Sequence, residues 1–111
     1  MRNSVMLIGR PGAEPELKTS NNQTVARFSL AVNEGRMNAN KEWIENTQWF
    51  RLVAFGLMAE RVGKVVRKGK QVAIEGSLHN NDWTDQNGVR HNVTEVWISD
   101  LFPIDFEKKD N

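Results

Sequence analysis

The sequence has no cysteine, and this absence excludes several kinds of chemistry. A chain without thiols forms no disulfide, has no thiol nucleophile and holds no zinc through sulfur. Long hydrophobic runs are also missing, since no stretch approaches the roughly 18 apolar residues that a membrane helix requires. The N-terminus lacks the charged and then apolar pattern of a signal peptide. We therefore expect a cytoplasmic protein without a membrane segment.

The sequence also lacks a large excess of either positive or negative charge, because 15 basic and 14 acidic residues give a formal net charge of +1. The overall balance therefore does not indicate a nucleic-acid partner, and only the local distribution of charge is informative. Residues 61–70 carry no acid and a run of basic side chains, namely Arg61, Lys64, Arg67, Lys68 and Lys70. Such a run fits a nucleic-acid surface, but it also fits the solvated face of a helix.

Signatures of catalysis are absent too. The chain has no nucleophile elbow, no phosphate-binding glycine loop and no metal-binding motif. Glu14 and Glu16 flank Pro15 in a predicted turn, which is more typical of a solvated loop than of a catalytic pair. His79 and His91 stand apart from any carboxylate cluster with ligand spacing. The sequence therefore predicts a protein that is not an enzyme and has no metal or cofactor.

What the 111 residues do contain is a set of strand patterns sufficient for one domain with a modest core. A short apolar run predicts a strand at 4–9, and alternating residues predict strands at 25–33, 47–55 and 72–78. The last strands flank a hairpin turn at 87–88. The connection at 34–46 is polar and long enough to be a functional loop or a protruding hairpin arm.

Two local signals complete the prediction. Asn87-Gly88 favours a type I′ turn, whose register would set Asp85 opposite Arg90. Residues 57–68 have helical periodicity, with apolar side chains on one face and charged ones on the other. Gly69 stands where a C-terminal cap is expected.

The resulting order is three strands, a helix and two further strands. This order matches a five-stranded, partly open Greek-key barrel, the OB-fold, with its helix between the third and fourth strands. We expect the barrel to occupy residues 1–102, followed by a short extension at 103–111.

The strand at 47–55 carries the first candidate site, because Trp49, Arg51 and Phe55 share one face. Burying a guanidinium between two aromatic rings without a partner would be costly in a core. On a surface, the rings could stack on bases while the arginine contacts phosphate or stacks itself. The alternative is a set of core aromatics with Arg51 at an edge.

The other tryptophans differ in their surroundings. Trp83 lies between Asp82 and Thr84 in the polar approach to a hairpin, where it would bury poorly, so we interpret it as a platform for a planar partner such as a base. Trp43 lies in the polar connection and could stack on a base or cover the mouth of the barrel. Trp97 stands in an apolar part of the last strand, which favours a core position or a subunit contact.

A family resemblance rests on short segments that occur in one order. They are Asn3-Ser-Val-Met-Leu-Ile-Gly9, Glu14-Pro15-Glu16, Ala26-Arg-Phe-Ser-Leu-Ala31, Thr47-Gln-Trp-Phe-Arg51, Phe55-Gly56 with Ala59-Glu60, Arg67-Lys-Gly69, Ile74-Glu-Gly76 and Trp83-Thr-Asp-Gln-x-Gly88. Through them, residues 3–98 resemble the bacterial single-stranded DNA-binding protein family.

The resemblance implies an OB-fold that forms a homotetramer and coats single-stranded DNA without sequence preference in replication, repair and recombination. It implies base stacking on Trp49, Phe55 and Trp83. A further stacking tryptophan of the family falls near Arg36, and Trp43 could substitute for it from the other side of that arm. The side chains that we expect to draw in phosphates are Arg51, Lys64, Lys68, Lys70 and Arg90.

The chain also departs from the family pattern. Residues 79–82 replace basic residues that usually precede the hairpin tryptophan, and Phe50 stands where the family often has a histidine at a subunit contact. The family's long tail with an acidic tip is missing here, although Ile104-Asp105-Phe106 is a short aromatic and acidic element. We therefore expect that tail-dependent replication and repair partners are not bound.

Two other interpretations use the same fold. A dimeric primosomal replication-restart protein is similarly short, but the intact Trp83-Thr-Asp-Gln motif argues against it. A small barrel nuclease would need clustered carboxylates and arginines, which the sequence does not show. We predict a single-stranded DNA-binding protein, a homotetramer with a dimer as the alternative.

Overall fold

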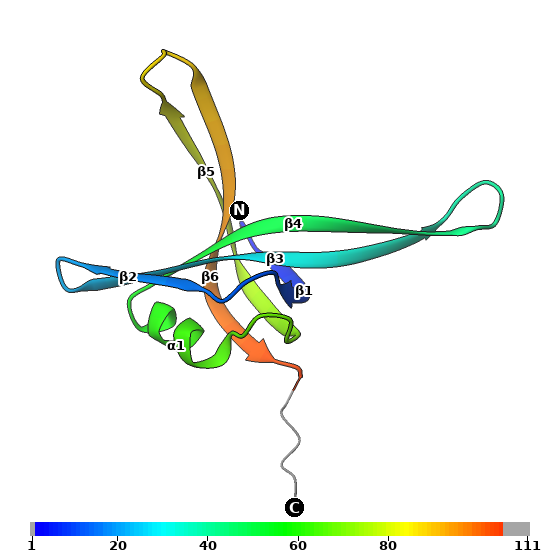
Figure 1. The fold of residues 1–111 in the computed structure, drawn as a ribbon, viewed down its shortest axis with the longest axis horizontal. Helices are drawn as coiled ribbons and strands as arrows, with labels where there is room; N and C mark the ends of the chain where they lie inside the picture. The colour runs from blue at the N-terminus through cyan, green and yellow to red at the C-terminus, as the bar shows by residue number, and fades with distance from the viewer. Residues whose placement is uncertain (1, 106–111) are drawn as a thin grey trace, which may run out of the picture.

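The computed structural model describes residues 2–105. Within them, the order of elements is β1 (Val5–Pro11), β2 (Glu16–Ser20), β3 (Gln23–Met37), β4 (Trp43–Phe55), α1 (Leu57–Val65), β5 (Val72–Thr84) and β6 (Arg90–Pro103). Figure 1 shows a small barrel from which long hairpins project in different directions, with α1 covering one end. In these residues no helix has the length and hydropathy of a membrane span.

The strands form one sheet that closes on itself. Its order is β1-β5-β6-β4-β3-β2, and β1 also pairs with β3 through Arg10 and Ala31. The contact between β4 and β6 is parallel, whereas the other pairs are antiparallel. Five strands therefore close the barrel, with β2 attached outside it to β3 and α1 between the third and fourth barrel strands. This is the OB-fold that the sequence predicts.

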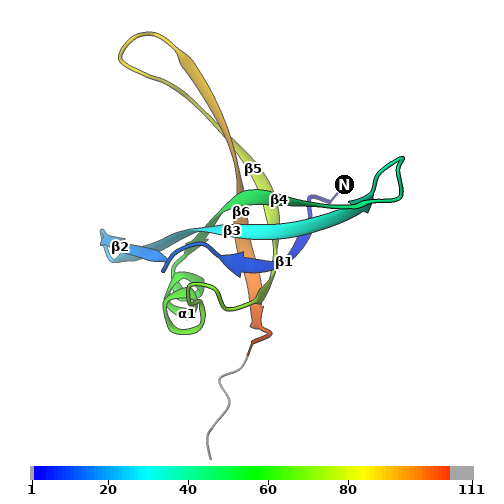
Figure 2. The ribbon, with the colours of Figure 1, turned by 45° about the vertical axis from the view of Figure 1, so that its right-hand side comes forward.

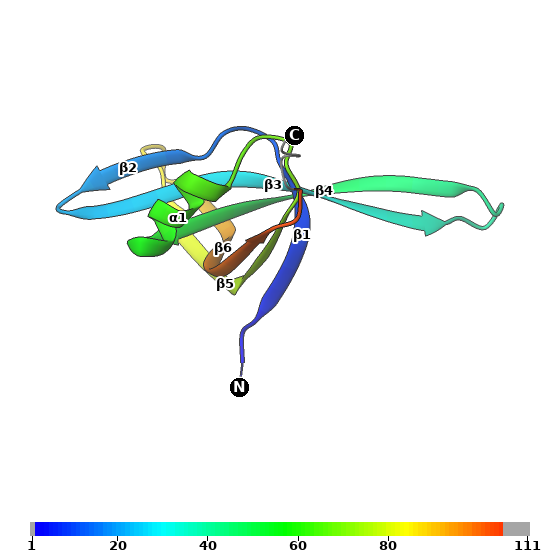
Figure 3. The ribbon, with the colours of Figure 1, turned by 90° about the horizontal axis from the view of Figure 1, so that it is seen from below.

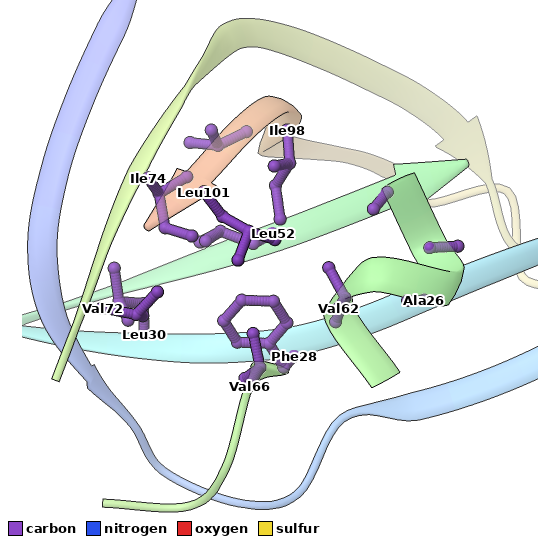
Figure 4. Close-up of a cluster of buried hydrophobic side chains, with 13 residues drawn as sticks. Ala26, Phe28, Leu30, Leu52, Val62, Val66, Val72, Ile74, Ile98 and Leu101 are labelled. Carbon is purple, nitrogen blue, oxygen red and sulfur yellow. The ribbon is translucent and has the colours of Figure 1, made fainter. Parts of the chain in front are cut away.

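The barrel encloses a core in which every buried residue of the described chain is apolar. Successive side chains of a strand point to opposite faces, so Phe28 and Leu30 of β3 and Leu52 of β4 all face inward. In Figure 4 these side chains meet Ile74 of β5, and Val62 of α1 closes the cluster from the helix side. The helical face predicted at 57–68 is therefore the buried one.

Strand β2 differs from the prediction, which placed Glu14, Pro15 and Glu16 in a turn. Glu16 instead begins a strand that pairs with β3, and all five residues of β2 are exposed. A fully exposed strand has no apolar face, so its sequence lacks the alternation that reveals a strand. The Leu17 side chain lies against Gly63 of α1, where a Cβ would approach Leu17 Cδ2 to 2.8 Å.

The helix also ends earlier than predicted. Its last residue is Val65, and Val66 is already extended, so Gly69 is not the cap. The Arg67 guanidinium donates to the carbonyls of Gly63 and Val66, which satisfies acceptors that the helix end leaves free. Gly69, with φ of 77°, lies in the following turn, and its N–H donates to a carbonyl of β1.

The turn between β5 and β6 is not the predicted type I′ turn. Gly88 has a positive φ of 78°, but Asn87 does not, and Arg90 pairs with Thr84 rather than with Asp85. The Asp85 carboxylate instead accepts hydrogen bonds from the N–H groups of Asn87 and Val89. These bonds stabilise a longer turn in which one glycine supplies the positive φ.

The connection predicted at 34–46 is a protruding arm. Pairing of β3 with β4 continues to Met37 and Trp43, and the Asn38 side chain accepts two backbone hydrogen bonds in the turn. Figures 2 and 3 show this arm and the β5–β6 hairpin leaving the barrel in different directions, with the β2–β3 hairpin opposite the arm.

At the other end of the chain, the N–H groups of Ile104 and Asp105 donate to the Gln71 carbonyl. The predicted element that ends at Phe106 lies partly outside the described residues. The predicted extension at 103–111 therefore stays a prediction.

Candidate nucleic-acid interface

The outer surface of β4 brings together the first three candidate residues. Trp49, Arg51 and Phe55 lie on the face opposite the core, and the exposed fraction is 61% for Trp49 and 37% for Phe55. The shared face that the alternation predicts is therefore present. The alternative in which these aromatics form the core is wrong, because Phe50, Leu52 and the residues paired with them already fill that side.

A groove of about 580 Å³ runs beside Trp49 and Arg51. Arg27 of β3 lines it as well, and the sequence did not single out this residue because its register against β4 was unknown. The remaining lining residues come mainly from the β1–β2 connection and from the neighbouring strands: Gly12, Ala13, Glu14, Glu16, Phe28, Ser29, Leu52, Val53 and Glu95. The groove thus combines an exposed indole and two guanidinium groups with a rim of carboxylates.

Two of the tryptophans are packed against glycines. A Cβ on Gly12 would come within 2.7 Å of the Trp49 ring, and a Cβ on Gly35 would overlap the Trp43 ring. Each indole therefore lies directly against backbone that carries no side chain, while both rings stay more than 60% exposed. An exposed ring held in this way has a restricted orientation, and this restriction lowers the entropy cost of stacking a ligand on it.

Trp43 lies on the same face of the β3–β4 arm as Trp49. The register pairs Met37 with Trp43 and Ala31 with Trp49, and residues an even number of positions apart share a face. Arg36 pairs with Ile44 and so lies on the opposite face of the arm. A role for Trp43 in covering the barrel mouth is wrong, because its ring packs within the arm itself.

Trp97 belongs to this outer surface and not to the buried core. Its ring stacks on His79 with centroids 3.7 Å apart, and it meets the Phe55 ring edge-on at 5.0 Å. The core position predicted for it is therefore wrong, while a subunit contact stays a prediction. The sequence could not show this cluster, since it depends on how β4, β5 and β6 align across a bulge at Glu75 and Gly76.

Trp83 lies on the β5–β6 hairpin, where it is 52% exposed and pairs directly with His91. The two rings stack with centroids 4.2 Å apart and an interplanar angle of 16°. His91 Nε2 is 2.9 Å from the carboxylate of Asp85. This hydrogen bond, together with those from the backbone N–H groups of Val89 and Asn87, holds the pKa of the Asp85 carboxyl below its ordinary value.

The predicted basic residues are distributed over several surfaces. Lys64 and Lys70 line a separate pocket of about 350 Å³ between the end of α1 and the end of β6. Lys68 follows the helix, and its N–H donates to Glu14 at the rim of the groove. Arg90 pairs with Thr84 and so lies on the opposite face of its hairpin from Trp83. Of the predicted phosphate contacts, Arg51 is the one that lines the groove.

Comparison with known proteins decides the family. A profile described as the single-strand binding protein family matches residues 2–104. The chain belongs to this family. It is 39% identical over 101 residues to "Single-stranded DNA-binding protein 1" of Chlorobaculum tepidum, a match that covers 89% of this chain and 62% of that relative. The chain therefore spans less than two thirds of the length of this relative.

A solved structure is also similar. It is described as "Plasmodium falciparum SSB complex with ssDNA", and it aligns with a TM-score of 0.87 and 38% sequence identity. The alignment covers 95% of this chain and 97% of the chain in that complex. The similarity thus extends over the barrel and both of its long hairpins, which are the elements that carry the aromatic residues described above.

Proposed function

We propose that this protein binds and coats single-stranded DNA without sequence preference, in replication, repair and recombination, and that it is not an enzyme. One observation carries the proposal: the outer surface presents Trp49, Arg51 and Phe55 on one face of a fold that matches a protein solved with single-stranded DNA. A protein with this function acts where single strands arise, so we expect it in the cytoplasm, at the nucleoid.

The mechanism that we propose is base stacking supported by phosphate contacts. Every base has a flat π-face, so stacking on Trp49, Phe55 and Trp83 tolerates any sequence. Arg27 and Arg51 line the groove beside Trp49, where their charges can neutralise phosphates and release counterions. The carboxylates at the rim oppose this attraction, and so stacking contributes more to affinity than charge does.

We propose that the strand continues along the β3–β4 arm to Trp43. This ring is 63% exposed and lies on the Trp49 face, whereas Arg36 lies on the opposite face and could contact phosphate only where the strand passes around the arm. Contacts to phosphate by Lys64, Lys68, Lys70 and Arg90 would likewise need the strand to leave the groove.

We further propose that the protein is a homotetramer. Along β1, Met6 and Ile8 expose 62% and 49% of their surface. The described pairings of β1 with β3 begin at Arg10, so Val5 to Gly9 are paired with β5 alone. An apolar strand with an unpaired edge favours association with another copy. Light scattering in solution distinguishes four copies from the two of a dimer.

Titration with oligothymidine, followed by intrinsic tryptophan fluorescence, tests the proposed function. Stacking of bases on exposed indoles should quench the emission substantially. Trp83→Ala should weaken binding and leave the fold intact, because that ring lies on an exposed hairpin. The proposal is contradicted if the wild-type protein binds duplex DNA as tightly as oligothymidine, or if folded Trp83→Ala binds normally.

A further inference from the structure

Trp83 is held from one side by a chain of contacts that starts in the hairpin turn. The Asp85 carboxylate accepts hydrogen bonds from N–H groups of the turn through Oδ1. Its Oδ2 forms a hydrogen bond with Nε2 of His91. The imidazole then lies nearly parallel to the indole of Trp83. Because each link is fixed by the previous one, the position of the indole depends on the imidazole.

We propose that His91 is a positioning residue for Trp83, and that it makes the affinity for single-stranded DNA increase as the pH falls from 8 to 6. This inference rests on the proposed function. His91 covers one face of the indole and leaves the other face open for a base. A ring that is already ordered loses less entropy when the base stacks on it.

Protonation of His91 strengthens both contacts that hold the ring. Imidazole is the side chain that ordinarily gains its proton between pH 5 and 8. An imidazolium donates a charge-assisted hydrogen bond to Asp85, which is stronger than the bond of a neutral ring. It also attracts the π-face of Trp83 as a cation. Since Asp85 has a lowered pKa, it stays ionised throughout this range.

The other charged groups near His91 do not share this geometry. Asp82 and Arg90 occupy neighbouring register positions on the opposite face of the hairpin, where Asp82 accepts a hydrogen bond from Asn92. Glu95 shares the face of His91, but it accepts a hydrogen bond from Asn81. Asp85 is thus the charged partner that faces His91 in the described structure.

The chain provides a matched control, because it contains two histidines and each stacks on a tryptophan. His79 Nε2 lies beside the hydroxyl of Ser77, not beside a carboxylate. Its ring covers Trp97, which is not among the proposed stacking platforms. His79→Phe and His91→Phe therefore remove the same titratable group from two different stacks, while a flat ring is kept in each.

The experiment measures oligothymidine affinity from pH 6 to pH 8 at constant ionic strength, since the ligand has no group that titrates in this range. We expect the wild-type protein and His79→Phe to bind about two- to five-fold more tightly at pH 6, the range of an exposed cation–π contact. His91→Phe loses the bond to Asp85, so it should bind more weakly than the wild type at pH 8 and show no pH dependence. His91→Ala should bind more weakly at both pH values.

A double-mutant cycle separates positioning from a general effect of charge. In the Trp83→Ala background, His91→Phe should have no further effect on affinity or on its pH dependence. The inference is overturned if His91→Phe keeps the pH dependence or if His79→Phe abolishes it. It is also overturned if His91→Phe changes affinity as much in the Trp83→Ala background as in the wild type. Absence of wild-type binding at pH 8 would instead contradict the proposed function itself.

Discussion

The barrel and the two long hairpins of this protein are stabilised in different ways. In the barrel, buried side chains such as Leu30, Leu52 and Ile74 are apolar and almost fully inaccessible. Along the hairpins, cross-strand pairs are polar and exposed, as in the bond from Thr94 to Asn80. The aromatic rings of the hairpins pack on glycine backbone or on histidine rings, not on a core.

This difference indicates that the residues that stabilise the fold are separate from those of the proposed interface. Burial of apolar surface stabilises the barrel, and the hairpins contribute few buried groups. Substitutions on the hairpins can therefore change the interface at little cost to the fold. The predictions below test this separation, beginning with the largest effect.

Leu52→Ala should destabilise the protein by about 2–5 kcal/mol, because it leaves a cavity in the barrel core. Chemical denaturation measures this loss of unfolding free energy. The affinity of the fraction that stays folded should be unchanged: although Leu52 borders the groove, it is only 1% exposed and its side chain packs in the core. Tighter or weaker binding by fully folded Leu52→Ala would show that the two regions are coupled.

Trp49→Ala should show the opposite behaviour. It should weaken oligothymidine binding by about 1–3 kcal/mol, the general range for single-strand-binding barrels of this kind and not one calculated from this structure. The unfolding free energy should change little, because the ring is 61% exposed. A large loss of stability without loss of affinity would identify Trp49 as a structural residue.

Gly12→Ala sharpens the comparison without altering an aromatic residue. A methyl group at this position would meet Trp49 Cζ3 at 2.7 Å and displace the ring. We expect affinity to fall by part of the loss seen in Trp49→Ala. Titration of the double variant Gly12→Ala, Trp49→Ala should give the affinity of Trp49→Ala alone. Additive losses of affinity would mean that Gly12 acts independently of the ring.

Arg51→Gln should change the salt dependence of binding more than the stability. Each phosphate neutralised on a single strand contributes about 0.7 to the slope of log affinity against log salt, so the slope should fall by about this amount. Trp49→Ala should leave the slope nearly unchanged. Lys70→Gln in the same assay tests whether Lys70 also neutralises a phosphate, because the pocket that Lys70 lines is separate from the groove.

Asp105→Ala should have the smallest effect, on stability alone. A hydrogen bond from the Gln71 N–H and the Arg10 guanidinium lower the pKa of this carboxyl from its ordinary value of 3.8. A lowered pKa stabilises the fold above the ordinary value, and this contribution disappears as the pH falls through the lowered one. The melting temperature should thus decrease slightly at pH 7, and the difference from wild type should disappear as the pH falls through the lowered pKa.

The barrel was predictable because its strands have one buried face. Alternation at 47–55 identified the side that holds Leu52 and the side that holds Trp49 and Arg51, and no tertiary information was needed for this distinction. Strand β2 could not be identified in this way, since both of its faces are exposed.

Contacts between separate strands were not predictable. The cluster of Phe55, Trp97 and His79 comes from three strands, and the packing of Trp49 on Gly12 joins β4 to a loop 37 positions earlier. Such contacts depend on register, and register is a property of paired strands that one-strand patterns do not contain.

The even spacing of aromatic residues along β4 limits how a strand can be bound. Trp43, Trp49 and Phe55 stand six residues apart on one face, which corresponds to separations on the order of 20 Å along an extended strand. Neighbouring stacked bases are much closer together than that. In the proposed complex, a bound strand would therefore touch the rings at intervals, with unstacked nucleotides between them. Affinity should then depend on the length of the oligonucleotide, and it should increase in steps as the oligonucleotide becomes long enough to reach the next ring.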